Sequence, residues 1–404
     1  MDNFTTVFRQ LLNQLPRREF KHDAAKGRYN RYCKHFTVWN QFVANLYAIA
    51  TNRDSLRDIE MGLKAERKTW STFGLKNISR SQLAYANKKR DYMIFKKLYY
   101  HLLSKCENQQ LHCNAVGRGK PRPKKKFRFK NKIAALDSTT ISLCLSLFPW
   151  SDYGQKKGAL KMHTLLDLGQ MIPTFASVTK GKMSDIRAAK QSPLPLSPDS
   201  ILVMDRAYTD FEWFDSLTKQ KVYFITRAKI DMAFEIIGQH KEIRNKRIVA
   251  DDVIRMTGRY TFKKYPHNLR LIELWDDEKN TSVYFLTNNF KLAATTIASA
   301  YKARWDIEIF FKWIKQNLKI KAFYGTSENA VKTQIWTAII FYLLLSYIKF
   351  QTRYDGTILK FCRIIRNSLF KNKDIIDLLW EDPDKWKKGR DPCVQRVLID
   401  LSSF

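Results

Sequence analysis

The sequence predicts a mixed α+β fold, in which a helical N-terminal domain precedes a mixed β-sheet flanked by helices. Residues 1–105 are poor in glycine and amphipathic, strand-like alternation starts only after a basic stretch at 117–132, and helical patterns return after residue 290. A chain of 404 residues is also too long for one ordinary core. The expected regions are a helical N-terminal domain at 1–115, a basic linker at 116–132, a core at 133–350 with a β-rich insertion at about 230–290, and a helical C-terminal region at 351–404.

The N-terminal domain carries two short segments with helical patterns, SLRDIEMGL (55–63) and SRSQLAYANKKR (79–90). The second segment ends in a basic cluster. Two such helices fit a helix-turn-helix DNA reader. A small helical domain of another kind gives the same pattern, so that alternative stays open.

The linker has the sequence GRGKPRPKKKFRFKNK, with nine basic residues in sixteen and no acid. Such a block usually forms a flexible connection, and beside a DNA reader it commonly contacts phosphates. Lys124, Lys125 and Lys126 at its centre are the expected contacts. The linker also marks a domain boundary.

The core begins with three segments of strand-like composition, 132–143, 157–168 and 171–181, the last two separated by a Gly-Gln turn. We expect three antiparallel strands here. The pattern continues with a short helix at 184–191, a buried strand at 200–208, a helix at 211–221 and a strand at 222–229. Hairpins followed by strand-helix-strand units predict a mixed sheet covered by helices.

The β-rich insertion is expected from further alternation in RYTFKKY (259–265), LRLIELW (269–275) and TSVYFLTNN (281–289). Each of these segments is expected to form a strand. The insertion precedes the helical segment that carries residues 301–315.

The charge balance indicates a polyanionic partner. Lys and Arg number 72 against 38 acidic residues, which gives a formal net charge of +34. Self-repulsion at this charge disfavours a compact state unless phosphates neutralise it, so nucleic acid is the first expectation. A basic protein that is merely soluble is the alternative.

Cysteine usage and hydropathy favour a cytoplasmic protein without a membrane partner. The six cysteines include no C-x-x-C pair, which fits reduced thiols, and the N-terminus lacks the pattern of a signal peptide. The most apolar run, residues 335–348, has 14 residues and is shorter than a bilayer span. A buried core helix is the better interpretation of this run.

Three acids have positions that point to chemistry. Asp137 and Asp205 each end or interrupt a buried strand, where an unbound carboxylate is costly. Each alone also fits a helix N-cap or a strand-end residue. In YKARWDIEIFFKWIK (301–315), helical geometry places Glu308 within an arc of about 80° that also holds the basic residues of this segment.

That polar stripe has two interpretations. Apolar residues flank it on both sides, Ile309 and Trp313 among them, so it is expected to lie between packed faces. It is either a solvated face with i,i+4 ion pairs or the wall of a phosphate-binding cleft. With Asp137 and Asp205, Glu308 makes a set of hard oxygen ligands suited to Mg²⁺ ions that assist phosphoryl transfer. His163, on a core strand, is expected to be packed and hydrogen-bonded.

Several motifs resemble those of the DDE transposases of bacterial insertion sequences, specifically the insertion-sequence-four family. The signature Y-x2-R-x3-E-x6-K is present, at Tyr301, Arg304, Glu308 and Lys315. LDST at 136–139 resembles the first-aspartate motif of that family, and DRAYTD at 205–210 resembles the second. The strand between them and the N-terminal helices are similar too, so the resemblance covers most of the chain.

The resemblance implies an RNase H-like (retroviral integrase-like) core. Asp137, Asp205 and Glu308 would be the catalytic acids and would bind two Mg²⁺ ions, with Mn²⁺ as a substitute. Contacts to DNA phosphates are implied for Tyr301, Arg304, Lys312, Lys315 and Arg206. The implied partners are double-stranded DNA, at transposon ends and target, and a second copy of the chain in a homodimer bound to the nucleoid.

The same family uses its insertion to form a DNA hairpin, with a tryptophan that receives a flipped base. Val283 or Tyr284 stands at that place here, with Trp275 nearby. Both the flipping residue and the hairpin step therefore stay open. Trp305 could stack on a base, although a packed core position is the expected one.

The predicted function is that of an insertion-sequence DNA transposase, which binds terminal inverted repeats and performs metal-dependent cleavage and strand transfer by cut-and-paste. One alternative is an RNase H-like metal-dependent nuclease without strand transfer. The other is a basic DNA-binding protein without catalytic activity.

Overall fold

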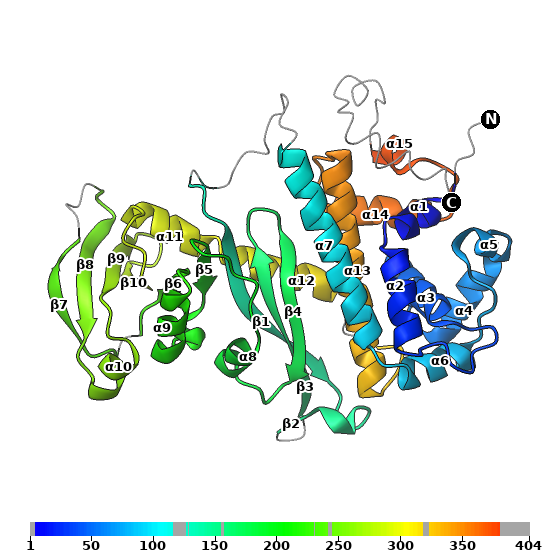
Figure 1. Ribbon diagram of the computed structural model, residues 1–404, viewed down its shortest axis with the longest axis horizontal. Coiled ribbons are helices and arrows are strands. Elements are labelled where there is room, and N and C mark those ends of the chain that lie inside the picture. Colours follow the sequence, from blue (N-terminus) through cyan, green and yellow to red (C-terminus); the bar gives the residue numbers. More distant parts are fainter. Residues whose placement is uncertain are drawn as a thin grey trace. The chain divides into compact units, whose positions relative to one another are not determined.

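The computed structural model describes residues 5–115, 127, 129–154, 157–229, 231–240, 245–317 and 323–379. The chain divides into two compact units (Figure 1). We call residues 1–120, 146–150 and 313–404 the helical unit, and residues 121–145 and 151–312 the sheet unit.

The helical unit combines N-terminal and C-terminal segments. Its N-terminal elements are α1 (Val7–Asn13), α2 (Arg17–Lys26), α3 (Val38–Thr51), α4 (Leu56–Ala65), the 3-10 turn η1 (Arg67–Thr69), α5 (Trp70–Phe73), α6 (Arg80–Lys89) and α7 (Met93–Ala115). Its C-terminal elements are α13 (Glu328–Thr352), α14 (Ile358–Ser368) and α15 (Ile375–Leu379). Residues 328–350 lie in the helical unit.

Helix α13 forms the centre of the helical unit. It packs against α7, which runs beside it, and against α3, α6 and α14 (Figure 1). The ring of Trp336 on α13 lies 5.5 Å from the ring of Tyr99 on α7. Among the described residues α13 is the one helix long and apolar enough to cross a membrane, but 89% of its most apolar window is buried in the protein. The expectation of a buried core helix at 335–348 is confirmed.

The two helices expected at 55–63 and 79–90 are confirmed as α4 and α6. Ser55 and Ser79 cap them by accepting hydrogen bonds from the backbone amides of Asp58 and Gln82. The two helices pack together, and the Glu60 carboxylate of α4 accepts the backbone N–H of Arg80 at 3.0 Å.

The sheet unit contains a ten-stranded sheet. The strands are β1 (Ile133–Leu143), β2 (Asp152–Gly154), β3 (Lys157–Asp167), β4 (Ile172–Lys180), β5 (Ile201–Met204), β6 (Tyr223–Arg227), β7 (Phe234–Gln239), β8 (Ile248–Met256), β9 (Leu269–Asp276) and β10 (Thr281–Thr287). The helical elements are α8 (Asp185–Gln191), the 3-10 turn η3 (Arg206–Tyr208), α9 (Phe211–Lys219), α10 (Arg259–Lys264), α11 (Ala294–Lys302) and α12 (Trp305–Asn317), whose last residues from Trp313 belong to the helical unit.

The strand order confirms the RNase H-like core. Strands β1, β3 and β4 form an antiparallel meander. Strand β5 then pairs parallel with β1 on the other side, and β6 pairs parallel with β5. The resulting order is β4-β3-β1-β5-β6, with the short strand β2 beside β3.

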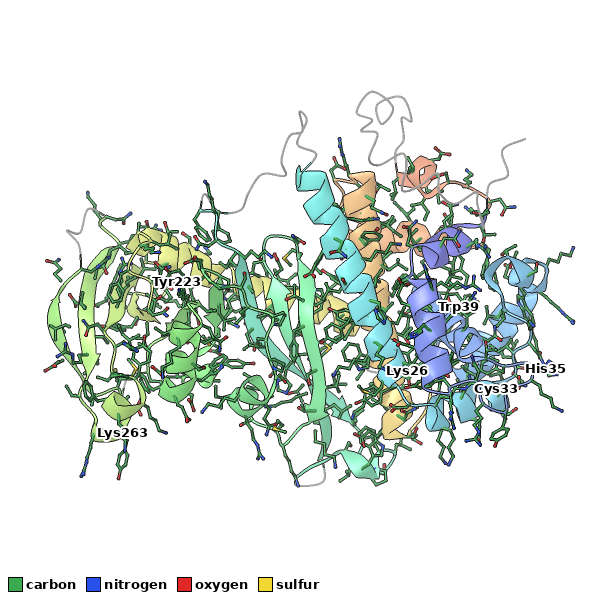
Figure 2. All side chains as sticks on the ribbon, in the orientation of Figure 1. Lys26, Cys33, His35, Trp39, Tyr223 and Lys263 are labelled. Carbon is green, nitrogen blue, oxygen red and sulfur yellow. The ribbon has the colours of Figure 1, made fainter. Side chains whose placement is uncertain are left out.

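The insertion continues the same sheet. Strand β10 pairs antiparallel with β6, and β9, β8 and β7 follow outward. Two of its expected strands are confirmed as β9 and β10. The third expectation is wrong, because residues 259–264 form helix α10, with Tyr260 81% exposed and Lys263 on its surface (Figure 2). The aromatic residues of the segment 259–265 do not form one buried strand face, since Phe262 is 44% exposed while Tyr265 is fully buried.

Helices cover both faces of the sheet. On one face α8 and α9 bury Ala189, Phe214 and Leu217 against strand residues such as Leu136 and Leu202. On the other face α11 packs on β5, β6 and β8, and the ring of Tyr301 lies 5.0 Å from that of Phe285 on β10. Strand side chains alternate between these faces.

Candidate active site

Two of the predicted acids lie side by side on parallel strands. The register pairs Leu136 of β1 with Met204 of β5, so the next residues, Asp137 and Asp205, occupy neighbouring positions. Strand β5 ends at Met204, and Asp205 starts the turn η3 by accepting the backbone N–H of Arg206 at 2.6 Å. The carboxylate of Asp137 accepts the backbone N–H of Ser138 at 2.7 Å.

Arg304 joins the third acid to the first. Its Nη1 donates to Asp137 Oδ2 at 3.0 Å, and its Nη2 donates to Glu308 Oε1 at 2.6 Å. The arginine side chain is 10% exposed, whereas the carboxylates of Asp137 and Glu308 are 18% and 38% exposed. One buried guanidinium thus connects a strand carboxylate with a helix carboxylate.

The charges of Asp205 and Glu308 both affect the pKa of Asp137. Burial raises the pKa of Asp137 to about 6; the Ser138 amide and Arg304 oppose this rise, and the negative charges of Asp205 and Glu308 add to it. Burial also raises the pKa of Tyr301, whose ring lies 5.9 Å from the Arg304 guanidinium.

The remaining predicted residues take different places. Arg206 is exposed on η3, directly after Asp205. Lys312 is exposed on α12, and Lys315 is half-buried on the part of α12 that belongs to the helical unit. The linker lysines Lys124, Lys125 and Lys126 lie outside the described residues.

The signature does not lie on one continuous helix. Helix α11 ends at Lys302, Ala303 and Arg304 form a turn, and α12 begins at Trp305. The expected packing on both sides of the stripe is also wrong in part, because Trp305 and Ile309 are 57% and 61% exposed. The guanidinium of Arg304 lies 5.8 Å from the Trp305 ring, which is a partner at the surface rather than a core contact.

A fourth carboxylate near the site, that of Asp185, has no counterpart among the predicted residues. It accepts hydrogen bonds from Ser138 and Lys161 on the opposite face of the sheet. Its sequence context, a Ser-Asp pair before an amphipathic segment, predicts only the start of a helix. The expectation for His163 is confirmed, since this residue is 3% exposed and its Nε2 lies 2.9 Å from Thr179 Oγ1.

The insertion presents aromatic side chains on one face. Tyr284 pairs with Glu273, and Ser282 pairs with Trp275, so Tyr284 and Trp275 share a face of the β9–β10 hairpin. They are 42% and 38% exposed. Val283 faces the other way and is buried, which removes it as a residue that could stack on a base.

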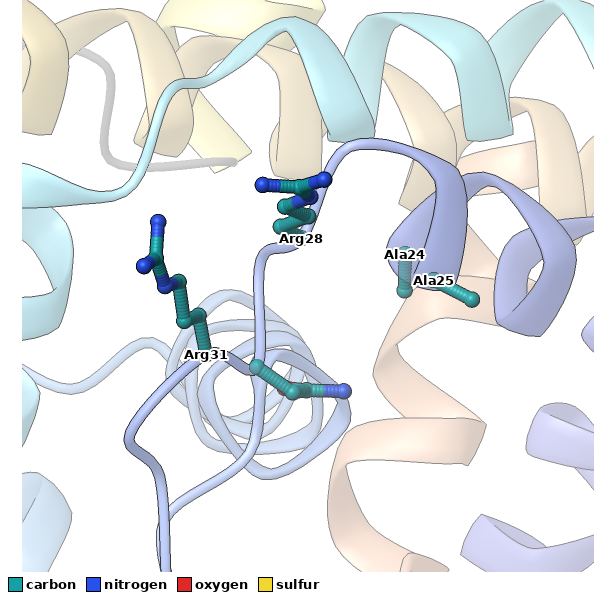
Figure 3. A pocket seen from close by; sticks show the side chains of 5 residues that line it. Ala24, Ala25, Arg28 and Arg31 are labelled. Atoms are coloured by element: carbon teal, nitrogen blue, oxygen red, sulfur yellow. The ribbon is translucent and has the colours of Figure 1, made fainter.

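A surface hollow of about 360 Å³ lies in the helical unit, and it contains none of the acids. It is lined by Ala24, Ala25, Arg28, Asn30 and Arg31 around the loop that follows α2 (Figure 3). The hollow is open and basic, which fits contact with an anion better than an enclosed catalytic site.

The sequence matches two known families. Residues 128–344 match the family described as "Transposase DDE domain", and residues 4–76 match one described as "Domain of unknown function (DUF4372)". The first match contains the meander, both strand acids and the signature helix. The second contains α1 to α5.

Named relatives are transposases. The chain is 30% identical over 244 residues to "Putative transposase y4zB" of Sinorhizobium fredii, over 59% of this chain and 67% of the relative. It is 27% identical over 297 residues to "Probable transposase for insertion sequence element IS5377" of Geobacillus stearothermophilus, over 73% of this chain and 74% of the relative. A solved piggyBac transposase synaptic complex with hairpin DNA aligns over 90% of this chain and 74% of that one, but its TM-score of 0.41 at 11% identity supports no conclusion.

Proposed function

The chain belongs to the family of transposase DDE domains and is a DNA transposase of an insertion sequence, and on this premise we propose that Asp137, Asp205 and Glu308 are its catalytic acids. The observation that carries the proposal is the placement of Asp137 and Asp205 on adjacent parallel strands, with Glu308 joined to Asp137 through Arg304. Asp137 is thus linked pairwise to the other two acids, while the described residues hold no ready-made group of three acidic, histidine or cysteine side chains around a metal position.

Enzymes of this family depend on a divalent metal, and the three acids carry the type of donor that such an ion needs. Their donors are all hard oxygen atoms, the type that Mg²⁺ prefers. The raised pKa of Asp137 marks a place where burial and like charges disfavour a further negative charge, and a divalent cation would relieve that cost. We propose Mg²⁺, two ions per site, with Mn²⁺ as a substitute. When bound, such a pair activates the attacking oxygen and stabilises the leaving oxygen of the phosphodiester.

Arg304 has two tasks in this proposal. Without DNA and metal, it neutralises part of the charge of Asp137 and Glu308 through its two hydrogen bonds. With both present, its donors become available to a DNA phosphate near the cut, and a guanidinium suits a phosphate because it can donate two parallel hydrogen bonds. Tyr301, Arg206, Lys312 and Lys315 are the other proposed phosphate contacts.

The proposed cleavage and joining both use the same acids. Asp137 lies in the paired backbone of β1 and Asp205 directly follows the last paired residue of β5, so both can orient the reacting phosphodiester with little rearrangement. In cleavage the attacking oxygen is that of water, and in strand transfer it is the 3′-hydroxyl of the excised end. Both reactions conserve the same in-line displacement at phosphorus.

The helical unit and the basic linker are proposed to hold the transposon ends. Helices α4 and α6 would form the DNA reader, and Lys124, Lys125 and Lys126 would contact phosphates beside it. The net charge of +34 supports a large polyanionic ligand. We further propose a homodimer that holds two ends, of the insertion-sequence-four type, acting on nucleoid DNA in the cytoplasm without a membrane partner.

The exposed pair Tyr284 and Trp275 is the proposed stacking surface for a flipped base, if ends leave as hairpins. An aromatic side chain in solvent can stack on a base of any identity. Replacing Tyr284 with Ala should then reduce hairpin formation on a pre-nicked terminal duplex, while nicking itself continues. Equal loss of both steps would remove Tyr284 from this role.

The central experiment is a cleavage and joining assay on a plasmid that carries the gene's own terminal repeats. Wild-type protein with Mg²⁺ should excise the element and join it to a target, and Asp205→Ala should do neither while retaining its affinity for the ends. Cleavage without joined products would indicate the nuclease alternative. Binding without cleavage by the wild type would indicate a DNA-binding protein without catalytic activity.

A further inference from the structure

Asp185 is the first residue of α8, and three side chains of the meander converge on one of its oxygen atoms. Its Oδ1 accepts the hydroxyl of Ser138 at 2.7 Å and the ammonium of Lys161 at 3.1 Å. The same oxygen lies 3.7 Å from His163 Nδ1. Ser138 and His163 are directly opposite each other in the β1–β3 register. Asp185 therefore connects the N-terminus of α8 to both β1 and β3.

Ser138 links this cluster to the first catalytic acid. Its backbone N–H donates to Asp137 Oδ1 at 2.7 Å, while its hydroxyl donates to Asp185. Because side chains alternate along a strand, Asp137 faces the α11 side of the sheet and Ser138 faces the α8 side. The hydrogen bond from Ser138 to Asp185 on the α8 face thus holds Ser138 in place. The backbone N–H of Ser138 in turn orients the Asp137 carboxylate on the α11 face.

The cluster also adjoins the turn that follows the second acid. Tyr208 lies in η3, three residues after Asp205, and is 2% exposed. Helix α8 packs on this turn. Burial raises the pKa of Tyr208, and the charges of Asp137 and Asp185 act in the same direction. Asp185 is therefore connected to Asp137 through Ser138, and its helix α8 packs on the turn that follows Asp205.

The ordinary role of an acid in the first turn of a helix is to interact with the helix dipole. That role needs no partner on a neighbouring strand, and it is screened where the side chain meets solvent. It accounts for an acid at this position but not for the bonds to Ser138 and Lys161. Those bonds connect elements that the DDE site must hold in register.

We propose that Asp185 is a positioning residue that fixes Ser138, and through it the carboxylate of Asp137, in the geometry that binds metal. The inference rests on the proposed function of Asp137 and Asp205 as metal ligands. Groups that orient metal ligands typically change metal affinity by about 10-fold to 100-fold when removed. Asp185 does so without touching the metal.

The test measures Mn²⁺ binding to the full-length, DNA-free protein by calorimetry, and then the Mg²⁺ concentration needed for single-turnover cleavage of a terminal-repeat duplex. The variants are Asp185→Ala, Asp185→Asn and Ser138→Ala. Asp215→Ala is the matched control, because Asp215 pairs with Lys219 at 2.6 Å and with His267 at 3.3 Å but lies on α9. Urea denaturation of every variant separates loss of fold from loss of metal.

Asp185→Ala and Ser138→Ala should each weaken Mn²⁺ binding by about 10-fold or more and raise the Mg²⁺ requirement of cleavage in proportion. Asp185→Asn, which keeps an acceptor for the Ser138 hydroxyl, should lose less than Asp185→Ala, and Asp215→Ala should bind like wild type. Should Asp185→Ala fail to fold, Ser138→Ala decides, since it removes the same bond and leaves the charge in place.

Wild-type Mn²⁺ affinity in folded Asp185→Ala or in Ser138→Ala would overturn the inference, and so would an equal loss in Asp215→Ala. Asp205→Ala separates this result from the premise. If Asp205→Ala loses Mn²⁺ binding and the Asp185 and Ser138 variants keep it, only the positioning role fails. If Asp205→Ala binds Mn²⁺ like wild type, the metal assignment itself fails, and the role of Asp185 with it.

Discussion

Arg270→Met is expected to lower the free energy of unfolding of the sheet unit by about 5 kcal/mol, because Arg270 is a fully buried cation with four hydrogen bonds. From β9 its Nε and Nη2 each donate to the Asp251 carboxylate of β8 at 2.7 Å. Its Nη1 donates to the backbone oxygens of Asn289 and Leu292, at 3.0 Å and 2.6 Å.

The magnitude follows from what the substitution leaves behind. Removing one partner of a buried ion pair costs about 3 to 5 kcal/mol, because the other charge stays buried and unpaired. The carbonyl oxygens of Asn289 and Leu292 also lose a charged donor, and an unsatisfied buried acceptor costs about 1 to 3 kcal/mol. These costs overlap, which gives about 5 kcal/mol in all. A typical domain has only about 5 to 15 kcal/mol of stability, so about a third or more of it would be lost.

The assay is urea denaturation of the full chain, with hydrogen exchange of the β8 and β9 amides to locate the loss. The control is Arg247→Met, since the Arg247–Asp277 ion pair at 3.1 Å is exposed and should be worth less than about 1 kcal/mol. The double variant Arg270→Met with Asp251→Leu should recover part of the loss, because it removes the orphaned charge. Equal stability of Arg270→Met and Arg247→Met, or no recovery in the double variant, would refute the reasoning.

Three further predictions concern the candidate site and the acid range. Glu308→Ala should abolish cleavage and joining while leaving affinity for terminal-repeat DNA largely intact in a binding assay; lost binding in a folded variant would argue against a role as metal ligand. Arg304→Ala should weaken end binding and cleavage together, because it removes a proposed phosphate contact; unchanged binding would place Arg304 with the carboxylates only. Burial lowers the pKa of His163 to about 4, below its unfolded value, so neutral His163 stabilises the fold above about pH 6.5, and this contribution is lost as the pH falls through about 4. Between pH 7 and 4.5, His163→Gln should therefore lose about 2 to 3 kcal/mol less unfolding free energy than wild type in urea titrations, and parallel losses would contradict the assignment.

Local patterns predict the strands of the core well. Alternating apolar residues and a turn at Gly169 and Gln170 place the meander at 132–143, 157–168 and 171–181, and the strands begin and end within one residue of these bounds. Burial on both faces accounts for the unbroken apolar run of β5, whose four residues are all buried. Such features depend on near neighbours, which a sequence displays directly.

Contacts between distant segments were not predictable in the same way. The sequence marks Arg304 as a phosphate ligand by resemblance, but its hydrogen bond to Asp137 joins residues 167 positions apart. The helix break at Ala303 could not be predicted, because no Gly or Pro lies at this position in the signature segment. The Ser-Asp pair at 184–185 reads as a helix start, because its bonds to β1 and β3 exist only after the meander forms.

The insertion extends the sheet outward from the strands that carry the candidate site. A sheet that grows at its edge leaves existing pairs intact, so the added strands do not disturb Asp137 or Asp205. Four strands lie beyond β6, and at about 4.8 Å per strand they carry β7 some 19 Å outward. That distance equals about five to six base-pair steps at 3.4 Å each. Each strand added at this edge therefore moves the outer edge of the sheet by little more than one base-pair step and leaves the pairing of β1 with β5 unchanged.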